Sequence, residues 1–137
     1  MNVVIDTNVL WVSIARRSVS HWIFEAILNG SLTLCVTTDI LDEYAEIMTL
    51  KLGTDTSEAV LSIFDNLPNI KLVTRYYRWF AIKNDPDDDK FVDCAVAANV
   101  ICIVTEDKHF NILKQNSFPK VEVMNMNAFK LFFEKVR

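Results

Sequence analysis

Residues 2–10 read Asn-Val-Val-Ile-Asp-Thr-Asn-Val-Leu, and this stretch decides the fold. The apolar, β-branched run from Val3 to Ile5 predicts a short strand buried on both faces. Asp6 follows this strand directly, and a helix is expected to begin just after Asn8. Similar apolar runs predict four further strands, at residues 32–36, 70–73, 101–104 and 121–124.

Helices are expected between the strands, first after Asn8 and then at residues 20–29, 38–52, 55–67, 86–99, 110–115 and 127–136. Ser20 and Thr38 are the expected N-caps of two of them, and Asp55 with Glu58 has capping-box spacing. Apolar strands that alternate with helices predict a parallel sheet covered on both faces. We therefore expect a single three-layer α/β/α domain over residues 1–137, with a central, mostly parallel five-stranded sheet.

Charge does not exclude a nucleic-acid substrate. The chain has 137 residues and a formal net charge of −4, but eight of its 18 acids lie in or beside the motifs described below. Without these eight, 10 acids face 14 Lys and Arg, so the rest of the chain is mildly basic, by about +4. Bound divalent ions would also cancel part of the acidic charge.

The three cysteines, Cys35, Cys94 and Cys102, lie in apolar runs and form no CxxC pair. Reduced, buried thiols are the expected state, which suits a reducing cytosol. No signal peptide is apparent, because a strand-like run meets Asp6 almost at once, and no apolar stretch is long enough to span a membrane. We therefore expect a cytoplasmic protein.

Four acidic clusters lie where strands end or helices begin, and they are centred on Asp6, Glu43, Asp89 with Asp93, and Asp107. Each alone has a simpler explanation, because an acid after a strand is often a turn residue or cap. An acid early in a helix also stabilises its positive end. Asp89 and Asp93 are four residues apart, so they share a helix face on which a cation would offset their repulsion.

The run Asp85-Pro-Asp-Asp-Asp-Lys-Phe-Val-Asp93 does not fit a calcium-binding EF-hand loop, since Lys90 replaces the glycine and Val96 the final Glu. The sequence has no P-loop and no GxGxxG motif. Carboxylates that converge cannot all ionise cheaply without a cation. Hard oxygen ligands favour Mg²⁺ or Mn²⁺, which can activate water against a phosphodiester. The sequence therefore predicts a divalent-metal site that acts on nucleic acid, with RNA the preferred candidate.

These motifs resemble those of the PIN-domain ribonucleases, including the VapC-type toxins. Asp6-Thr-Asn-Val-Leu resembles their opening motif, and Glu43 in Leu41-Asp-Glu-Tyr resembles the second acid. Asp93-Cys-Ala-Val-Ala-Ala resembles the third, an Asp that heads a small apolar helix. Val104-Thr-Glu-Asp-Lys-His-Phe resembles the fourth. The resemblance extends from residue 2 to residue 123, and it implies a PIN-like fold.

The resemblance also implies that single-stranded RNA is cleaved with Mg²⁺ or Mn²⁺, leaving 5′-phosphate and 3′-hydroxyl ends. The implied catalytic and metal-binding acids are Asp6, Glu43, Asp93 and Asp107, with Asp89 as an additional metal ligand. Asn8 and Thr105 would be hydrogen-bonding partners of these ligands.

A toxin role is implied as well, with a protein antitoxin as partner and a homodimer as the assembly. Arg16 and Arg17 follow the first helix near the expected site and are candidates for contacts to RNA phosphates, although a solvated loop is an equally good interpretation. Glu106 departs from the pattern, because this branch of the family often has a small residue there. A bulky acid beside Asp107 would narrow the site or repel RNA. The alternative hypothesis is a catalytically degenerate PIN domain that binds RNA or a protein without cutting it.

Overall fold

The structure is a computed structural model of the chain, and it describes residues 1–74, 78–79, 82, 86–115 and 120–136. Its central element is a five-stranded sheet with the order β3-β2-β1-β4-β5, in which every neighbouring pair is parallel. The strands are β1 (Asn2–Ile5), β2 (Thr33–Val36), β3 (Ile70–Leu72), β4 (Cys102–Val104) and β5 (Val123–Met124). The predicted five-stranded sheet is confirmed, and it is parallel throughout.

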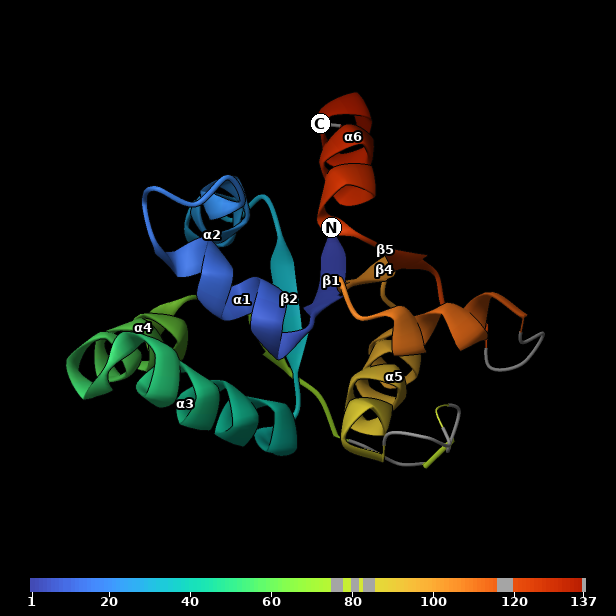
Figure 1. Cartoon of the computed structure of the whole chain (residues 1–137), viewed down its shortest axis with the longest axis horizontal. Helices are drawn as coiled ribbons and strands as arrows, with labels where there is room; N and C mark the ends of the chain where they lie inside the picture. Colours follow the sequence, from blue (N-terminus) through green and yellow to red (C-terminus); the bar gives the residue numbers. More distant parts are fainter. Residues whose placement is uncertain (75–77, 80–81, 83–85, 116–119, 137) are drawn as a thin grey trace.

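Helices flank this sheet in the order that the sequence predicts (Figure 1). They are α1 (Thr7–Ile14), α2 (His21–Leu28), α3 (Thr38–Leu52), α4 (Thr54–Asn66), α5 (Pro86–Ala98), the 3₁₀ helix η1 (Lys108–Gln115) and α6 (Met126–Val136). Helix α5 packs against β1, β2 and β4, while α1 packs against α2 and α3. Within the described residues, none of the helices is both long and apolar enough to cross a membrane.

Two helix caps differ from the prediction. Thr37, not Thr38, caps α3, because its side chain accepts a hydrogen bond from the Ile40 N–H at 3.3 Å. The capping box predicted for α4 is wrong as well, since Gly53 occupies the N-cap position and Asp55 lies within the first turn. Gly53 has a φ of 91°, a left-handed conformation that links α3 and α4 without an intervening loop.

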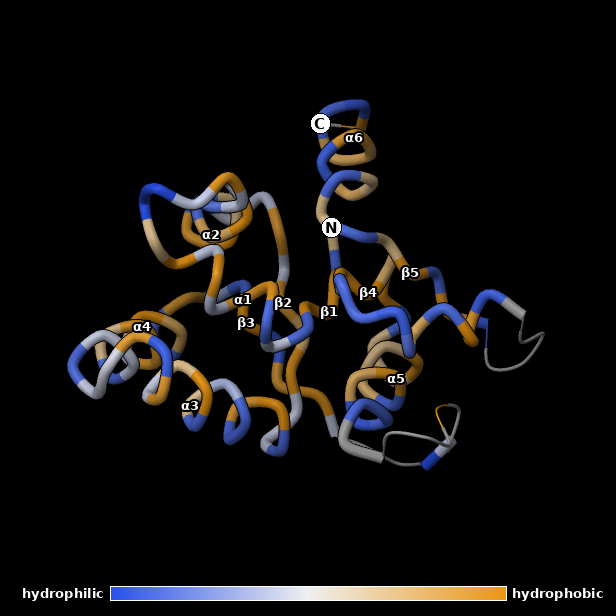
Figure 2. Tube along the Cα trace, viewed as in Figure 1, coloured by the Kyte–Doolittle hydropathy of each residue, from blue (hydrophilic) through white to orange (hydrophobic). Residues whose placement is uncertain are grey.

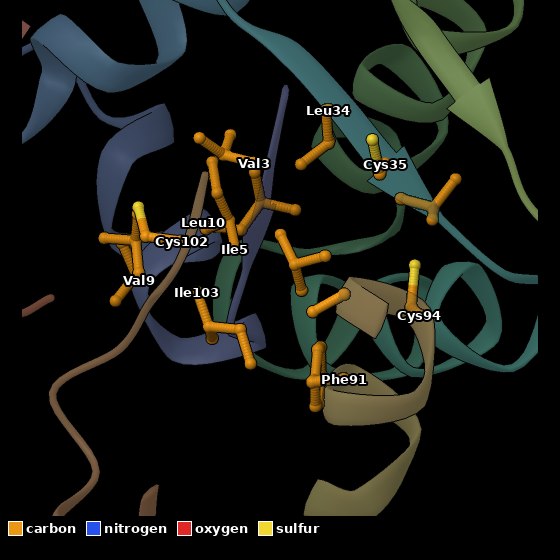
Figure 3. Close-up of a cluster of buried hydrophobic side chains, with 14 of the residues drawn as sticks. Val3, Ile5, Val9, Leu10, Leu34, Cys35, Phe91, Cys94, Cys102 and Ile103 are labelled. Atoms are coloured by element: carbon orange, nitrogen blue, oxygen red, sulfur yellow. The ribbon is translucent and has the colours of Figure 1, made fainter. Parts of the chain in front are cut away.

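The core lies where the middle of the sheet meets the helices. Val3, Val4 and Ile5 of β1 are fully buried, because a central parallel strand is covered on both faces. Figure 3 shows side chains from three strands, α1 and α5 meeting in this core. Figure 2 shows the strands as largely hydrophobic and α3 as alternating between hydrophobic and hydrophilic residues, as expected for a helix with one buried side.

The three cysteines are free and buried, as predicted. Burial raises the pKa of the Cys94 and Cys102 thiols to about 12, which keeps them protonated and unreactive at neutral pH. They belong to the core and not to a chemical site.

The strand order places a change of connection direction at β1, where a site can form. Strand β1 connects through α1 and α2 to β2 on one side, and β4 lies on its other side. Ligands of such sheets bind where the connections diverge in this way, at the carboxyl ends of the strands. The first turns of α1, α3 and α5 lie at this end of the sheet (Figure 1). The Tyr44 hydroxyl of α3, fully buried, donates a hydrogen bond to the Ile5 carbonyl and fixes α3 against β1.

Candidate functional site

Asp6 is the centre of the candidate site. It follows β1, occupies the N-cap position of α1, and is 6% exposed. Its Oδ2 accepts a hydrogen bond from the Thr105 hydroxyl at 2.7 Å, and Thr105 directly follows β4. The Thr105 Oγ1 in turn accepts the N–H of Asp107 at 3.0 Å. One buried hydroxyl therefore links the predicted first and fourth acids.

Glu43 approaches the same edge from α3. Its Oε2 accepts a hydrogen bond from the hydroxyl of Thr7, the residue after Asp6. Its Oε1 lies 2.7 Å from the Nζ atom of Lys90, on α5. Sequence reasoning missed both Thr7 and Lys90, although each is the immediate neighbour of a predicted ligand.

The carboxylates of this edge act on each other electrostatically. Burial raises the pKa of Asp6 above its ordinary value, and hydrogen bonds from the Thr105 side chain and the Thr7 backbone partly oppose this. The Glu43 and Asp107 carboxylates raise the pKa of Asp6 further. The Glu43 and Asp107 charges therefore disfavour ionisation of Asp6, and a cation placed among the three acids would offset this repulsion.

A second group of possible ligands continues from Asp107. The Nδ1 atom of His109 lies 3.5 Å from Oδ1 of Asp107 and 4.0 Å from Oδ2 of Asp88. One ligand atom from each of these three residues lies within 4.8 Å of the others. Ligands that bind one ion at about 2.1 Å stand about 3–4 Å apart, so the separations of 3.5 Å and 4.0 Å from His109 suit a shared metal. The sequence analysis singled out neither Asp88 nor His109 as a ligand, although His109 is two residues after Asp107.

Asp89 and Asp93, the predicted ligands on α5, have other contacts. Asp89 Oδ1 accepts the Ile82 N–H at 2.8 Å, and Asp93 Oδ1 accepts the Trp79 N–H at 2.9 Å. Both carboxylates are buried, and each accepts a backbone N–H from a residue that precedes α5. Metal binding by these two acids stays a prediction. Asp85, at the start of the acidic run, lies outside the described residues.

Asn8 has a local contact rather than one with the acids. Its side-chain oxygen accepts a hydrogen bond from Nε1 of Trp11 at 3.2 Å, one turn along α1. Thr7 is the residue of this motif that reaches a carboxylate, that of Glu43.

Arg16 and Arg17 lie at the other end of α1 from Asp6, and their contacts to RNA phosphates stay a prediction. They follow the carboxyl end of α1, whose eight residues span about 12 Å from the Asp6 end. Arg16 lines a hollow with Ile14 and residues of α2. Because the short helix α1 begins at the site, its carboxyl end lies away from the site.

The Glu106 carboxylate is directed to α6. Its Oε1 accepts the N–H of Met126, the first residue of that helix, at 2.6 Å. An acid at a helix N-terminus is stabilising. Glu106 therefore has a partner away from Asp107, which weakens the expectation that it narrows the site.

Comparisons with known proteins find a matching family model and two structures of similar fold. The family model described as PIN domain matches residues 2–109. The structure is similar to that of VapBC2 from Rickettsia felis bound to a DNA fragment from their promoter, with 16% identity over 91% of this chain and 98% of that chain and a TM-score of 0.63. It is also similar to DNA-bound VapBC from Salmonella typhimurium, with 16% identity over 92% of this chain and 98% of that chain and a TM-score of 0.57. At this identity the two structures show a shared fold. No curated protein matches the sequence.

Asp6→Asn is expected to raise the free energy of unfolding at pH 7 without metal, because the substitution removes a carboxylate whose charge is disfavoured by burial. The folded-state pKa of Asp6 lies above its ordinary value of 3.8, so wild-type stability falls as pH rises through the folded pKa. The advantage of the variant should therefore shrink as pH is lowered and vanish below the unfolded pKa.

Urea unfolding in EDTA across this pH range measures the effect, with Asp42→Asn, an exposed acid of α3, as the matched control. If Asp6→Asn were no more stable than wild type at pH 7, burial of the Asp6 charge would be fully compensated in the folded protein.

Proposed function

The chain belongs to the PIN domain family, and we propose that it is a divalent-metal-dependent nuclease that cleaves single-stranded RNA. One observation carries the proposal: at the carboxyl edge of a parallel sheet, the Thr105 hydroxyl joins Asp6 to Asp107, and Glu43 accepts the hydroxyl of the residue after Asp6. This edge is where ligands of such folds bind.

The residues present fit Mg²⁺ or Mn²⁺. The donors of Asp6, Glu43 and Asp107 are hard carboxylate oxygens, which these ions prefer. Burial already disfavours the charge on Asp6, so a cation would be held against a carboxylate poorly solvated by water. When bound, such an ion would lower the pKa of a water molecule and offset charge on a phosphodiester. The Thr105 hydroxyl would orient the Asp6 carboxylate toward that ion.

The second candidate function is a PIN domain that binds RNA or a protein without cutting it. The ion pair between Lys90 and Glu43 favours it, because a cation already occupies one of the expected metal ligands. So do the backbone hydrogen bonds of Asp89 and Asp93, which give two further acids a structural task. Cleavage remains the better-supported proposal, because Asp6 and Asp107 keep their mutual arrangement through Thr105.

Incubation with a fluorescent single-stranded RNA and Mn²⁺ tests cleavage. We expect wild type to cut the RNA and Asp6→Asn to cut it at least about 100-fold more slowly, since even residues behind a metal ligand are worth 10–100-fold. Product ends are read by gel mobility after phosphatase treatment, and 5′-phosphates are expected. Equal cleavage by both proteins would reject the site, and no cleavage of any RNA by wild type would favour the non-cutting alternative.

His109 and Asp88 are expected to contribute to metal binding. His109→Gln should weaken Mn²⁺ binding about tenfold and Mg²⁺ binding less, because imidazole suits transition metals better than Mg²⁺. Asp88→Asn should weaken both. Calorimetric titration of the metal-free proteins gives the affinities.

His21→Gln is the matched control for this experiment, because the His21 ring bonds the Ser13 carbonyl at the far end of α1. An unchanged Mn²⁺ affinity in His109→Gln would remove His109 from the metal site.

The toxin of a toxin–antitoxin pair is the biological role we propose. Its support is the fold shared with the two VapBC structures and the match to the PIN family model. In this role a protein antitoxin would cover the acidic edge. The chain would form a homodimer and act in the cytoplasm.

Induced expression in a bacterial host tests this role. We expect wild type to arrest growth, Asp6→Asn to leave growth unchanged, and co-expression of the product of an adjacent small gene to relieve the arrest. Normal growth with wild-type protein that cleaves RNA in vitro would separate the nuclease activity from the toxin role.

A further inference from the structure

Lys90 has an unusual place for a lysine. It lies near the start of α5, directly after Asp88 and Asp89, and its side chain is only 13% exposed. Its Nζ is 2.7 Å from Oε1 of Glu43, and it lies 5.6 Å from the ring centre of the fully buried Phe91. The lysine therefore enters the acidic edge instead of extending into solvent.

Helix formation does not explain this position. Near a helix N-terminus the backbone dipole favours acids over lysine. A mostly buried ammonium group also loses hydration, and it must be compensated by a close partner. Glu43 is that partner, so the Lys90 position is determined by a carboxylate of the candidate site.

We propose that Lys90 is an exchangeable counter-ion: it neutralises Glu43 before the metal binds, and it binds a phosphate of the RNA once the metal takes Glu43. This inference rests on the proposed function, because it assigns a phosphate ligand to the same site. A lysine suits the exchange, since its ammonium is a compact point charge on a flexible four-carbon stem. Lysine is also a common phosphate ligand in proteins.

The exchange follows from charge. A divalent ion that binds Asp6 and Glu43 repels an ammonium group 2.7 Å from the same carboxylate. An RNA phosphate brings a new negative charge to the same edge and offers the displaced ammonium a partner. Lys90 and the metal therefore compete for Glu43 in the absence of RNA. When RNA is present, both contact its phosphate.

A purely structural salt bridge between α3 and α5 is the competing explanation, and the two make opposite predictions for metal binding. If Lys90 competes with the metal, Lys90→Gln should bind Mn²⁺ more tightly. If the pair only holds Glu43 in place, the same variant should bind Mn²⁺ equally or more weakly.

The first measurement is the Mn²⁺ affinity without RNA, obtained at low ionic strength by electron paramagnetic resonance of free Mn²⁺. We expect Lys90→Gln to bind at least about tenfold more tightly than wild type, since removing one repelling charge a few ångströms away has about this effect even in bulk water. Lys90→Arg, which keeps the charge, should stay close to wild type. In the Glu43→Gln background, Lys90→Gln should bring no gain. Thermal unfolding of each variant verifies that it is folded.

The second measurement is the affinity for single-stranded RNA, obtained by fluorescence anisotropy at a series of salt concentrations. The samples contain Ca²⁺, and the RNA is shown to be intact. The slope of log Kd against log salt should fall by about 0.7 in Lys90→Gln, the value for one phosphate contact on a single strand. Lys135→Gln, an exposed lysine of α6, is the matched control and should change neither measurement.

An Mn²⁺ affinity that is unchanged or weaker in folded Lys90→Gln would overturn the counter-ion role. A tighter Mn²⁺ affinity with an unchanged salt slope would overturn the phosphate contact. Both shifts in a protein that cuts no RNA would instead refute the proposed nuclease activity and leave the role of Lys90 in place.

Discussion

The register between β1 and β4 is the constraint on which the site depends. Ile5 pairs with Val104, so the next residue on each strand, Asp6 and Thr105, stand side by side. Their hydrogen bond of 2.7 Å follows from that register. A shift of one residue would turn every side chain of the strand to the other face of the sheet. Because Val3, Val4 and Ile5 are fully buried between two covered faces, such a shift would require the core to repack on both sides of the sheet. Hydrophobic packing of the strands thus fixes the position of Asp6 and Thr105, although these two polar residues lie beyond the apolar strand residues.

The fold could be predicted from the sequence because the central strands β1, β2 and β4 carry apolar residues on both faces, a pattern typical of a covered parallel sheet. The same logic placed Asp6 and Asp107 at one edge, since both follow strands. The spacing of residues along a helix could not predict which part of the chain a given helix face contacts. Asp89 and Asp93 share a face, as their spacing indicates, but that face binds the segment containing Trp79. The acid that lies beside Asp107 is Asp88, one residue and about 100° earlier on α5.

At this edge of the sheet, the packing that stabilises the fold also buries a carboxylate that would be better solvated in water. A fully buried tyrosine hydroxyl, that of Tyr44, binds the carbonyl of Ile5, and the next residue is an acid whose charge is disfavoured by burial. Rigid packing keeps Asp6 in place although its ionised form would be better solvated in water. Such a group has a higher energy in the folded chain than an amide of the same shape, which is typical of sites that must receive a cation. The hydrophobic core supplies the free energy that offsets this cost.

The ion pair between Lys90 and Glu43 bears on whether this fold cuts or only binds. A permanently paired Glu43 would leave Asp6 and Asp107 as the acids of the edge, with fewer ligands for a metal and a site better suited to binding than to hydrolysis. An ammonium that leaves Glu43 restores the third carboxylate and adds a cation for the phosphate. Both states are compatible with one backbone, because the stem of a lysine can move without the helix that carries it. The distinction between nuclease and binding module therefore depends on the free energy of one ion pair relative to a metal–carboxylate bond, and not on the fold.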